Sequence, residues 1–150
     1  MKKAPLSAAL AVLSLLSGPA FAHHSFAALY DANKPVRLKG KLTKIDWTNP
    51  HTYFHIDVVS RDGSVHNWSV EGAGPGALSR RGFKDGDIKI GDTLIVDGYL
   101  TKKPGTYLVD GRLVTLPDGR IINGGTPGDG GPGDKGKGAE ADAKQANKAS

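Results

Sequence analysis

Histidines offer the most reactive chemistry in this chain. There are five, and His23 and His24 directly follow Ala20-Phe21-Ala22, a small-x-small pattern at which signal peptidase cuts. A cut after Ala22 would give His23 a free α-amine. That amine and the Nδ1 of the His23 imidazole can chelate one ion, and nitrogen donors in a planar arrangement favour Cu(II). Copper is therefore a candidate cofactor, with His23 and His24 as candidate ligands.

A third nitrogen ligand would have to come from the folded part of the chain. His51 is the candidate, because Asn49-Pro50 places it on a turn that leads into a predicted strand. A cut after Ala20 would instead put His23 third in the chain, which is also a Cu(II)-chelating position. Since an N-terminal His-His chelates metal in any peptide, the alternative that these residues have no metal role stays open.

Four further residues are candidates for binding a ligand without metal: Trp47, Asn49, Arg80 and Arg81. The arginine pair could bind an anion, although the phosphate-loop spacing is absent. The alternatives are that Trp47 belongs to the core and that the arginines are a solvated helix end. The chain has no G-x-S-x-G and no H-E-x-x-H, and it assembles no other catalytic set. We therefore expect a protein that is not an enzyme.

Composition narrows the classes of function further. The chain has no cysteine, which excludes disulfides, thiolate metal sites and covalent haem attachment. Its formal net charge is +5, but Lys2 and Lys3 in the predicted signal contribute two of those charges. The remaining charges alternate in sign along the chain and do not cluster as a nucleic-acid interface would require. We therefore expect no nucleic-acid partner.

The first 22 residues have the order of a secretory signal peptide. Lys2 and Lys3 precede an apolar run over residues 6–16, and Ala20-Phe21-Ala22 follows. The run is too short to span a membrane, which takes about 20 apolar residues. No Arg pair precedes it, so Sec export is expected. The sequence thus predicts a protein of the periplasm or the medium, without stable membrane insertion after cleavage.

The elements that must position the candidate residues are predicted to be strands. Residues 52–59 alternate apolar and polar side chains, and Arg61-Asp62-Gly63 predicts a three-residue hairpin loop. The expected register pairs Val58 with His66, Ile56 with Trp68, and Phe54 with Val70. His55 then falls on the outer, solvated face and His66 near the end of the apolar face, and neither is expected to bind a metal.

Further strands are predicted for residues 36–46, 93–100 and 107–115, and a short helix for 77–82. Five strands with one short helix between the third and fourth match a small OB-like Greek-key barrel, and a fragment of a β-sandwich is the alternative. The predicted organisation is a signal peptide (1–22), an N-terminal arm (23–35), the OB-like β-barrel domain (36–122) and a disordered tail (123–150). The tail is rich in Gly, Pro, Lys and Ala and lacks large apolar residues.

Several segments of the chain resemble one known family in combination. They are His23-His24-Ser25-Phe26, residues 30–35, Trp47-Thr48-Asn49-Pro50-His51 and residues 78–83. Together they resemble a family of small secreted proteins of unknown function from Gram-negative bacteria, over about residues 23–122. The resemblance implies export and an OB-like fold. Such proteins occur alongside periplasmic quinoprotein dehydrogenases, which implies a periplasmic protein as a candidate partner.

The sequence therefore predicts an exported periplasmic binding module, and it leaves two versions open. In the first, the module binds copper through the mature N-terminal His23 together with His51. In the second, it is a non-catalytic accessory or ligand-binding OB module that partners a periplasmic enzyme without metal. An enzyme that works without metal ranks last, because no group of residues supports one.

Overall fold

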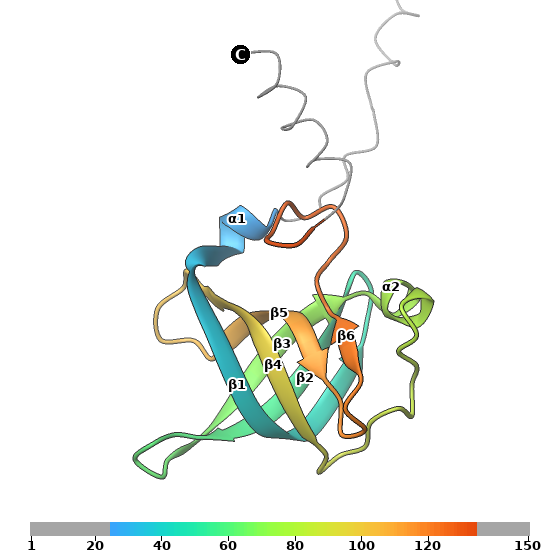
Figure 1. The fold of residues 1–150 in the computed structure, drawn as a ribbon. Helices are drawn as coiled ribbons and strands as arrows, with labels where there is room; N and C mark the ends of the chain where they lie inside the picture. The colour runs from blue at the N-terminus through green and yellow to red at the C-terminus, as the bar shows by residue number, and fades with distance from the viewer. Residues whose placement is uncertain (1–24, 135–150) are drawn as a thin grey trace, which may run out of the picture.

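The computed structural model describes residues 25–134, and over this range the chain is mainly β (Figure 1). Its strands are β1 (Tyr30–Trp47), β2 (His51–Val59), β3 (Val65–Ala73), β4 (Thr93–Thr101), β5 (Leu108–Thr115) and β6 (Ile121–Asn123). Two short helices accompany them, α1 (Phe26–Leu29) and α2 (Pro75–Arg80). No helix among the described residues is long and apolar enough to cross a membrane.

The six strands belong to one sheet, in the order β3-β2-β1-β4-β5-β6. Neighbours in this order are antiparallel, and β3 also pairs with β5 in parallel. The pairings therefore form a closed ring, which runs from β1 through β2, β3, β5 and β4 and back to β1. The sequence predicted five strands; β6 is the sixth, which the turn over residues 116–120 returns onto β5.

The hairpin of β2 and β3 has the predicted register. Val58 lies opposite His66, Ile56 opposite Trp68, and Phe54 opposite Val70. Gly63 supplies the left-handed backbone of the loop, with φ of 84°. A slip of one residue would turn the apolar side chains of one strand away from those of the other, so the alternating pattern was enough to specify this pairing.

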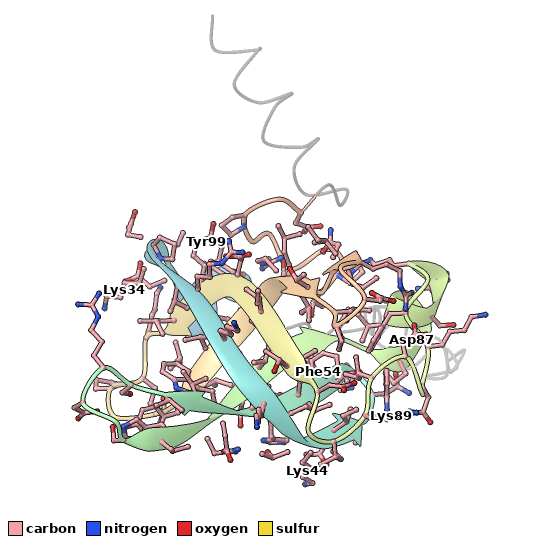
Figure 2. All side chains as sticks on the ribbon, turned by 60° about the horizontal axis from the view of Figure 1, so that its bottom comes forward. Lys34, Lys44, Phe54, Asp87, Lys89 and Tyr99 are labelled. Carbon is pink, nitrogen blue, oxygen red and sulfur yellow. The ribbon has the colours of Figure 1, made fainter. Side chains whose placement is uncertain are left out.

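The core lies between the facing parts of this curved sheet. Phe54, Ile56 and Val70 from the hairpin meet Leu94 and Val96 from β4, all of them fully buried. Figure 2 shows Phe54 within the fold, whereas Lys44 and Lys89 point outward. The helix predicted over residues 77–82 forms slightly earlier, as α2, because Pro75 can occupy its first turn.

The N-terminal boundary differs from the prediction. The expected arm of residues 23–35 is replaced from Phe26 onward by α1 and by the first part of β1. Tyr30 pairs with Thr101 and Pro35 pairs with Tyr99, and the register is irregular between these two pairs. Proline, which has no N–H to donate, is typically found at such irregular positions in a sheet. The predicted signal peptide, His23 and His24 lie outside the described residues.

The C-terminal boundary differs more. Residues 123–134, assigned by composition to the disordered tail, continue the fold: Asn123 ends β6, and residues 124–134 cross the end of the sheet toward α1 (Figure 1). Thr126 and Asp129 are buried there, and the Phe26 N–H donates to the Asp129 carbonyl at 2.9 Å. We call residues 124–134 the C-terminal segment. The rest of the predicted tail, residues 135–150, lies outside the described residues.

Candidate functional site

A buried arginine joins three parts of the chain under the C-terminal segment. Arg112 is only 9% exposed. Its terminal nitrogens donate to both carboxylate oxygens of Asp129, at 3.2 and 2.7 Å, and its Nε lies 2.5 Å from the Asp110 carboxylate. The guanidinium carbon also lies 4.8 Å from the centre of the Phe26 ring. We call these four residues the Arg112 cluster.

Next to this group, Glu71 of β3 accepts hydrogen bonds from two tyrosines. The hydroxyls of Tyr30 and Tyr53 donate to its Oε2 at 2.8 and 3.1 Å. Its other oxygen lies 3.4 Å from Nδ1 of His51, which is also 3.2 Å from the Thr126 hydroxyl. We call these five residues the Glu71 cluster. It ties the start of β2 to the C-terminal segment.

Burial sets the protonation of these groups. Burial and the negative charge of Glu71 raise the pKa of Tyr53 to about 12 and that of Tyr30 further. Both tyrosines are therefore neutral donors to Glu71 throughout the physiological range. Burial also raises the pKa of Asp110 to about 6 against the opposing pull of Arg112, and the charges of Asp129 and Glu71 add to the rise.

The two clusters together carry an excess of acidic groups. Glu71, Asp110 and Asp129 are three buried carboxyl groups, and Arg112 is the permanent cation that touches two of them. A buried carboxylate is costly unless it is paired. The raised pKa of Asp110 relieves this excess, because the group can take up a proton just below neutral pH.

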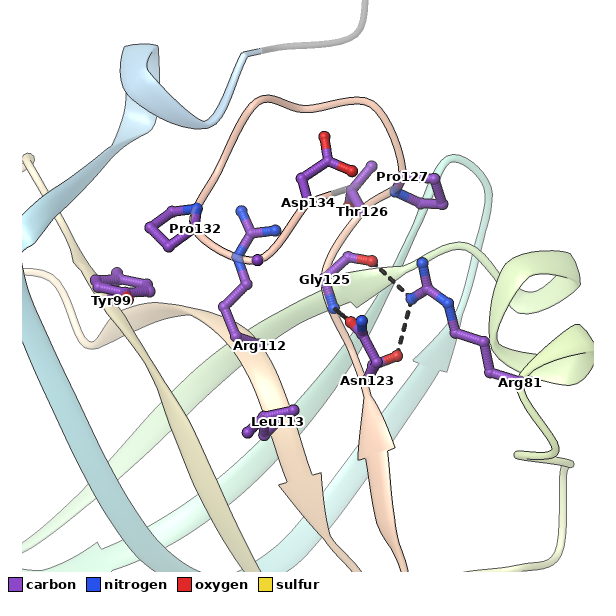
Figure 3. Close-up of a pocket in the computed structure, with 11 residues that line it drawn as sticks. Arg81, Tyr99, Arg112, Leu113, Asn123, Gly125, Thr126, Pro127, Pro132 and Asp134 are labelled. Atoms are coloured by element: carbon purple, nitrogen blue, oxygen red, sulfur yellow. Dashed lines mark hydrogen bonds between the residues drawn. The ribbon is translucent and has the colours of Figure 1, made fainter. Parts of the chain in front are cut away.

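A groove opens beside the Arg112 cluster, on the outer face of β4, β5 and β6 (Figure 3). Its volume is about 690 Å³, and a second hollow of about 400 Å³ shares Tyr99, Arg112 and Leu113 with it. The walls are largely apolar and include Tyr99, Leu113 and two prolines of the C-terminal segment, Pro127 and Pro132. This groove and the two clusters form the candidate site.

Arg81 forms one wall of the groove, directly after α2. Its Nη1 donates to the carbonyls of Asn123 and Gly125, at 2.8 and 2.7 Å, as the dashed lines in Figure 3 mark. Burial lowers the pKa of Arg81, but an arginine remains a cation at neutral pH. The two carbonyls thus hold a positive charge at the edge of a mostly apolar cavity.

The structure brings two of the predicted site residues together at this end of the sheet. His51 lies in the Glu71 cluster, with its side chain only 12% exposed, and Arg81 lines the groove. Arg80, its neighbour in the chain, is exposed on α2 and does not line the groove. His23 and His24 lie outside the described residues, and within residues 25–134 no three His, Cys, Asp or Glu side chains are grouped to hold a metal.

The turn before His51 has a structural role. Trp47 stacks on Phe83 with ring centres 5.4 Å apart and packs against the core, which agrees with the core alternative. Asn49 is exposed and precedes Pro50 through a cis peptide bond. Gly74 approaches this turn so closely that a Cβ there would lie 2.6 Å from the Pro50 carbonyl oxygen. Neither Trp47 nor Asn49 lines the groove.

Sequence reasoning missed the charged residues at the centre of the site. Asp110 and Arg112 are two apart on β5, and Glu71 lies within β3, between Val70 and Gly72. Ionisable residues inside predicted strands indicate buried ion pairs, and this signal was present in the sequence. The partners of Glu71 and Arg112, which are Tyr30 and Asp129, lie far away in the chain and could not be identified in this way. His55, expected to be solvated, is half-buried: its Nε2 is 2.8 Å from Asp46 and its Nδ1 3.2 Å from Ser69.

Comparison with protein families identifies the family of this chain. The model of a family of unknown function (DUF6152) matches residues 10–107. The chain belongs to the DUF6152 family. In this DUF6152 member the matched range contains the whole of β1 to β4, with His51, Glu71 and Arg81, and it ends before β5 with Arg112. No curated protein and no solved structure matches the chain.

Proposed function

We propose that this DUF6152 protein is an exported, non-catalytic binding module, and that its ligand occupies the groove beside the Arg112 cluster. The observation that carries the proposal is the groove itself. Its volume of about 690 Å³ falls within the roughly 300–1,000 Å³ typical of small-molecule sites. A few polar groups in mostly apolar walls are also typical of such sites.

The chemistry of the walls favours a ligand with an apolar body and one anionic group. Tyr99 and Leu113 offer apolar surface on the strands, and Pro127 and Pro132 offer it from the C-terminal segment. Arg81 offers a cation whose position is held by two carbonyls. A preorganised cation in an apolar setting binds a carboxylate or sulfonate more strongly than a flexible surface lysine would.

Two further observations support the finer parts of the proposal. The ring of pairings among β1, β2, β3, β5 and β4, with α2 between β3 and β4, supports an OB-like barrel, a fold that serves mainly as a binding scaffold. The signal-like order of residues 1–22 supports export to the periplasm or the medium. A periplasmic enzyme is the proposed partner. Either a ligand of that enzyme or a segment of the enzyme itself would bind in the groove.

A titration with 8-anilinonaphthalene-1-sulfonate tests the groove, because this probe combines aromatic rings with one anionic group. We expect the wild-type chain to bind it and Arg81→Ala to bind it about tenfold or more weakly, as expected for the loss of one charged hydrogen-bond donor. Leu113→Ala should also weaken binding. Ile121→Ala is the matched control, since Ile121 is 63% exposed but does not line the groove. Equal affinity of all four proteins would contradict the proposal.

Copper is the second candidate ligand, and one observation favours it. Phe26 is anchored by its N–H to Asp129 and by its ring to Arg112. The described chain therefore begins at the end of the sheet where Thr126 contacts His51. Because Nδ1 of His51 is engaged by Thr126 and Glu71, its Nε2 is the nitrogen that remains as a donor to a metal held by His23.

A Cu(II) titration with EPR distinguishes this candidate. In a chain that begins at His23, we expect a single site whose spectrum changes and whose affinity falls at least about tenfold in His51→Ala, since one of three nitrogen ligands is lost. One added residue ahead of His23 should have a similar effect, because it removes the chelating α-amine. His66→Ala serves as the control. If neither His51→Ala nor the added residue changed the copper affinity, the histidines would chelate copper only as they do in a free peptide.

A further inference from the structure

We propose a second binding site, separate from the groove, that takes an acidic sugar ring. It lies where the β4–β5 loop meets β3. We call His66, Trp68 and Tyr107 the aromatic platform, and Lys34 and Lys103 stand beside it. The groove proposed above uses none of these five residues.

The aromatic platform is held in a defined geometry. Tyr107 stacks on His66, with ring centres 4.4 Å apart and planes 17° from parallel, and meets the Trp68 ring edge-on at 5.2 Å. His66 and Trp68 are two apart on β3, so they share one face of the strand. The N–H of Ser69 donates to the Tyr107 carbonyl at 2.8 Å, which fixes the backbone of Tyr107 against β3. The rings are therefore ordered before any ligand binds.

A cavity of about 300 Å³ lies against this platform. Trp68 and Tyr107 line it together with Lys34, Lys103 and the turn at Pro104. Tyr107 is 44% exposed, which is a large aromatic surface for water to cover. Lys103 has no ion pair among residues 25–134, whereas Lys34 lies 3.5 Å from Asp31. The cavity thus combines an aromatic wall with one unpaired and one partly neutralised ammonium group.

This combination fits a sugar ring that carries a carboxylate. The faces of aromatic rings are electron-rich, so they attract the weakly positive C–H groups on one face of a pyranose. The lysine ammonium groups are suited to the carboxylate. The cavity volume is at the lower limit for a small-molecule site, which suits one or two sugar units. A nucleobase would also stack, but nucleic acid needs a continuous basic surface along its phosphates, and Asp31 interrupts the basic surface here.

Isothermal titration calorimetry of the full-length protein with oligogalacturonate, an oligomer of acidic sugars, tests the proposal. We expect binding that weakens as salt is raised, because the lysines contribute charge. Tyr107→Ala should lower the affinity about tenfold, in line with the loss of one stacking contact, and Lys103→Ala about threefold. Leu113→Ala, in the groove, is the matched control and should leave this affinity unchanged.

Three results would overturn the proposal. The first is the absence of binding, or binding that Tyr107→Ala leaves intact in a protein whose circular dichroism is unchanged. The second is equal affinity for neutral malto-oligosaccharides, which would remove the role of the lysines. The third is tighter binding of oligothymidylate, which would make the site a nucleic-acid platform. Because Arg81→Ala should not alter this titration, failure here is distinguishable from failure of the groove.

Discussion

Replacing Arg112 by alanine is expected to lower the free energy of unfolding by about 3–5 kcal/mol, the usual result of removing one partner from a buried ion pair. The side chain is buried and contacts the carboxylates of Asp110 and Asp129 as well as the Phe26 ring. Without the guanidinium, both carboxylates would remain buried and unpaired. We also expect the C-terminal segment to detach, since Asp129 is its main ionic link to β5.

Urea unfolding at pH 7.5 measures this loss. Arg37→Ala is the matched control, because Arg37 forms an ion pair with Asp97 at 3.3 Å while 66% exposed. Exposed pairs of this kind contribute about 1 kcal/mol or less. If Arg112→Ala cost no more than Arg37→Ala, the Arg112 cluster would not hold the fold together. Binding of the anilinonaphthalene probe should also fall in Arg112→Ala, because the C-terminal segment forms one wall of the groove.

Asp110→Asn is expected to become more stable relative to the wild type by about 2–3 kcal/mol as the pH rises from 4 to 7. The pKa of Asp110 is raised to about 6 by burial, chiefly, and by the charges of Asp129 and Glu71. Because its pKa is raised in the folded state, the protonated Asp110 carboxyl group stabilises the fold. This stabilisation is present in full at pH values below the ordinary pKa near 3.8. This contribution is lost as the pH rises through 6. Asparagine cannot ionise, so it avoids the loss, which amounts to about 1.36 kcal/mol per pKa unit.

Urea unfolding of both proteins at several values between pH 4 and pH 8 measures the difference between them. Taking the difference removes the contribution of other carboxylates, many of which act in the opposite direction. Asp118→Asn illustrates this as a control: hydrogen bonds from the Arg120 backbone and side chain lower the pKa of Asp118. The stabilisation by Asp118 is therefore present at neutral pH and lost on acidification, so its difference curve should slope the other way. A flat curve for Asp110→Asn would mean that Asp110 has the same pKa in the folded and the unfolded chain, and so that burial does not raise it.

The same ionic contacts that stabilise the fold also shape the groove. Gly131 shows how close the packing is, because a Cβ at this position would collide with the Arg112 guanidinium. Asp129 and Gly131 thus hold the C-terminal segment against Arg112. Pro127 and Pro132 of this segment line the groove. Conditions that loosen Arg112 should therefore weaken stability and ligand binding together.

The sequence by itself determined the elements whose signals are local. Alternation of side chains in residues 52–59 and the turn at Asp62-Gly63 were sufficient for the register of β2 and β3, since a one-residue slip exposes the apolar face. The short helix and the strands after it followed from the same kinds of local pattern. His51 and Arg81 could be proposed as candidate site residues because each stands beside a predicted turn or helix end.

Only the tertiary structure decided which polar residues meet. Glu71 contacts Tyr30 from 41 residues away, and Arg112 contacts Asp129 across 17 residues. No periodic pattern encodes such pairs. The same limit explains the misplaced tail boundary: residues 123–134 lack large apolar side chains, so composition alone predicted disorder. Their order comes from hydrogen bonds and an ion pair to β5 and α1, which exist only once those distant segments have come together.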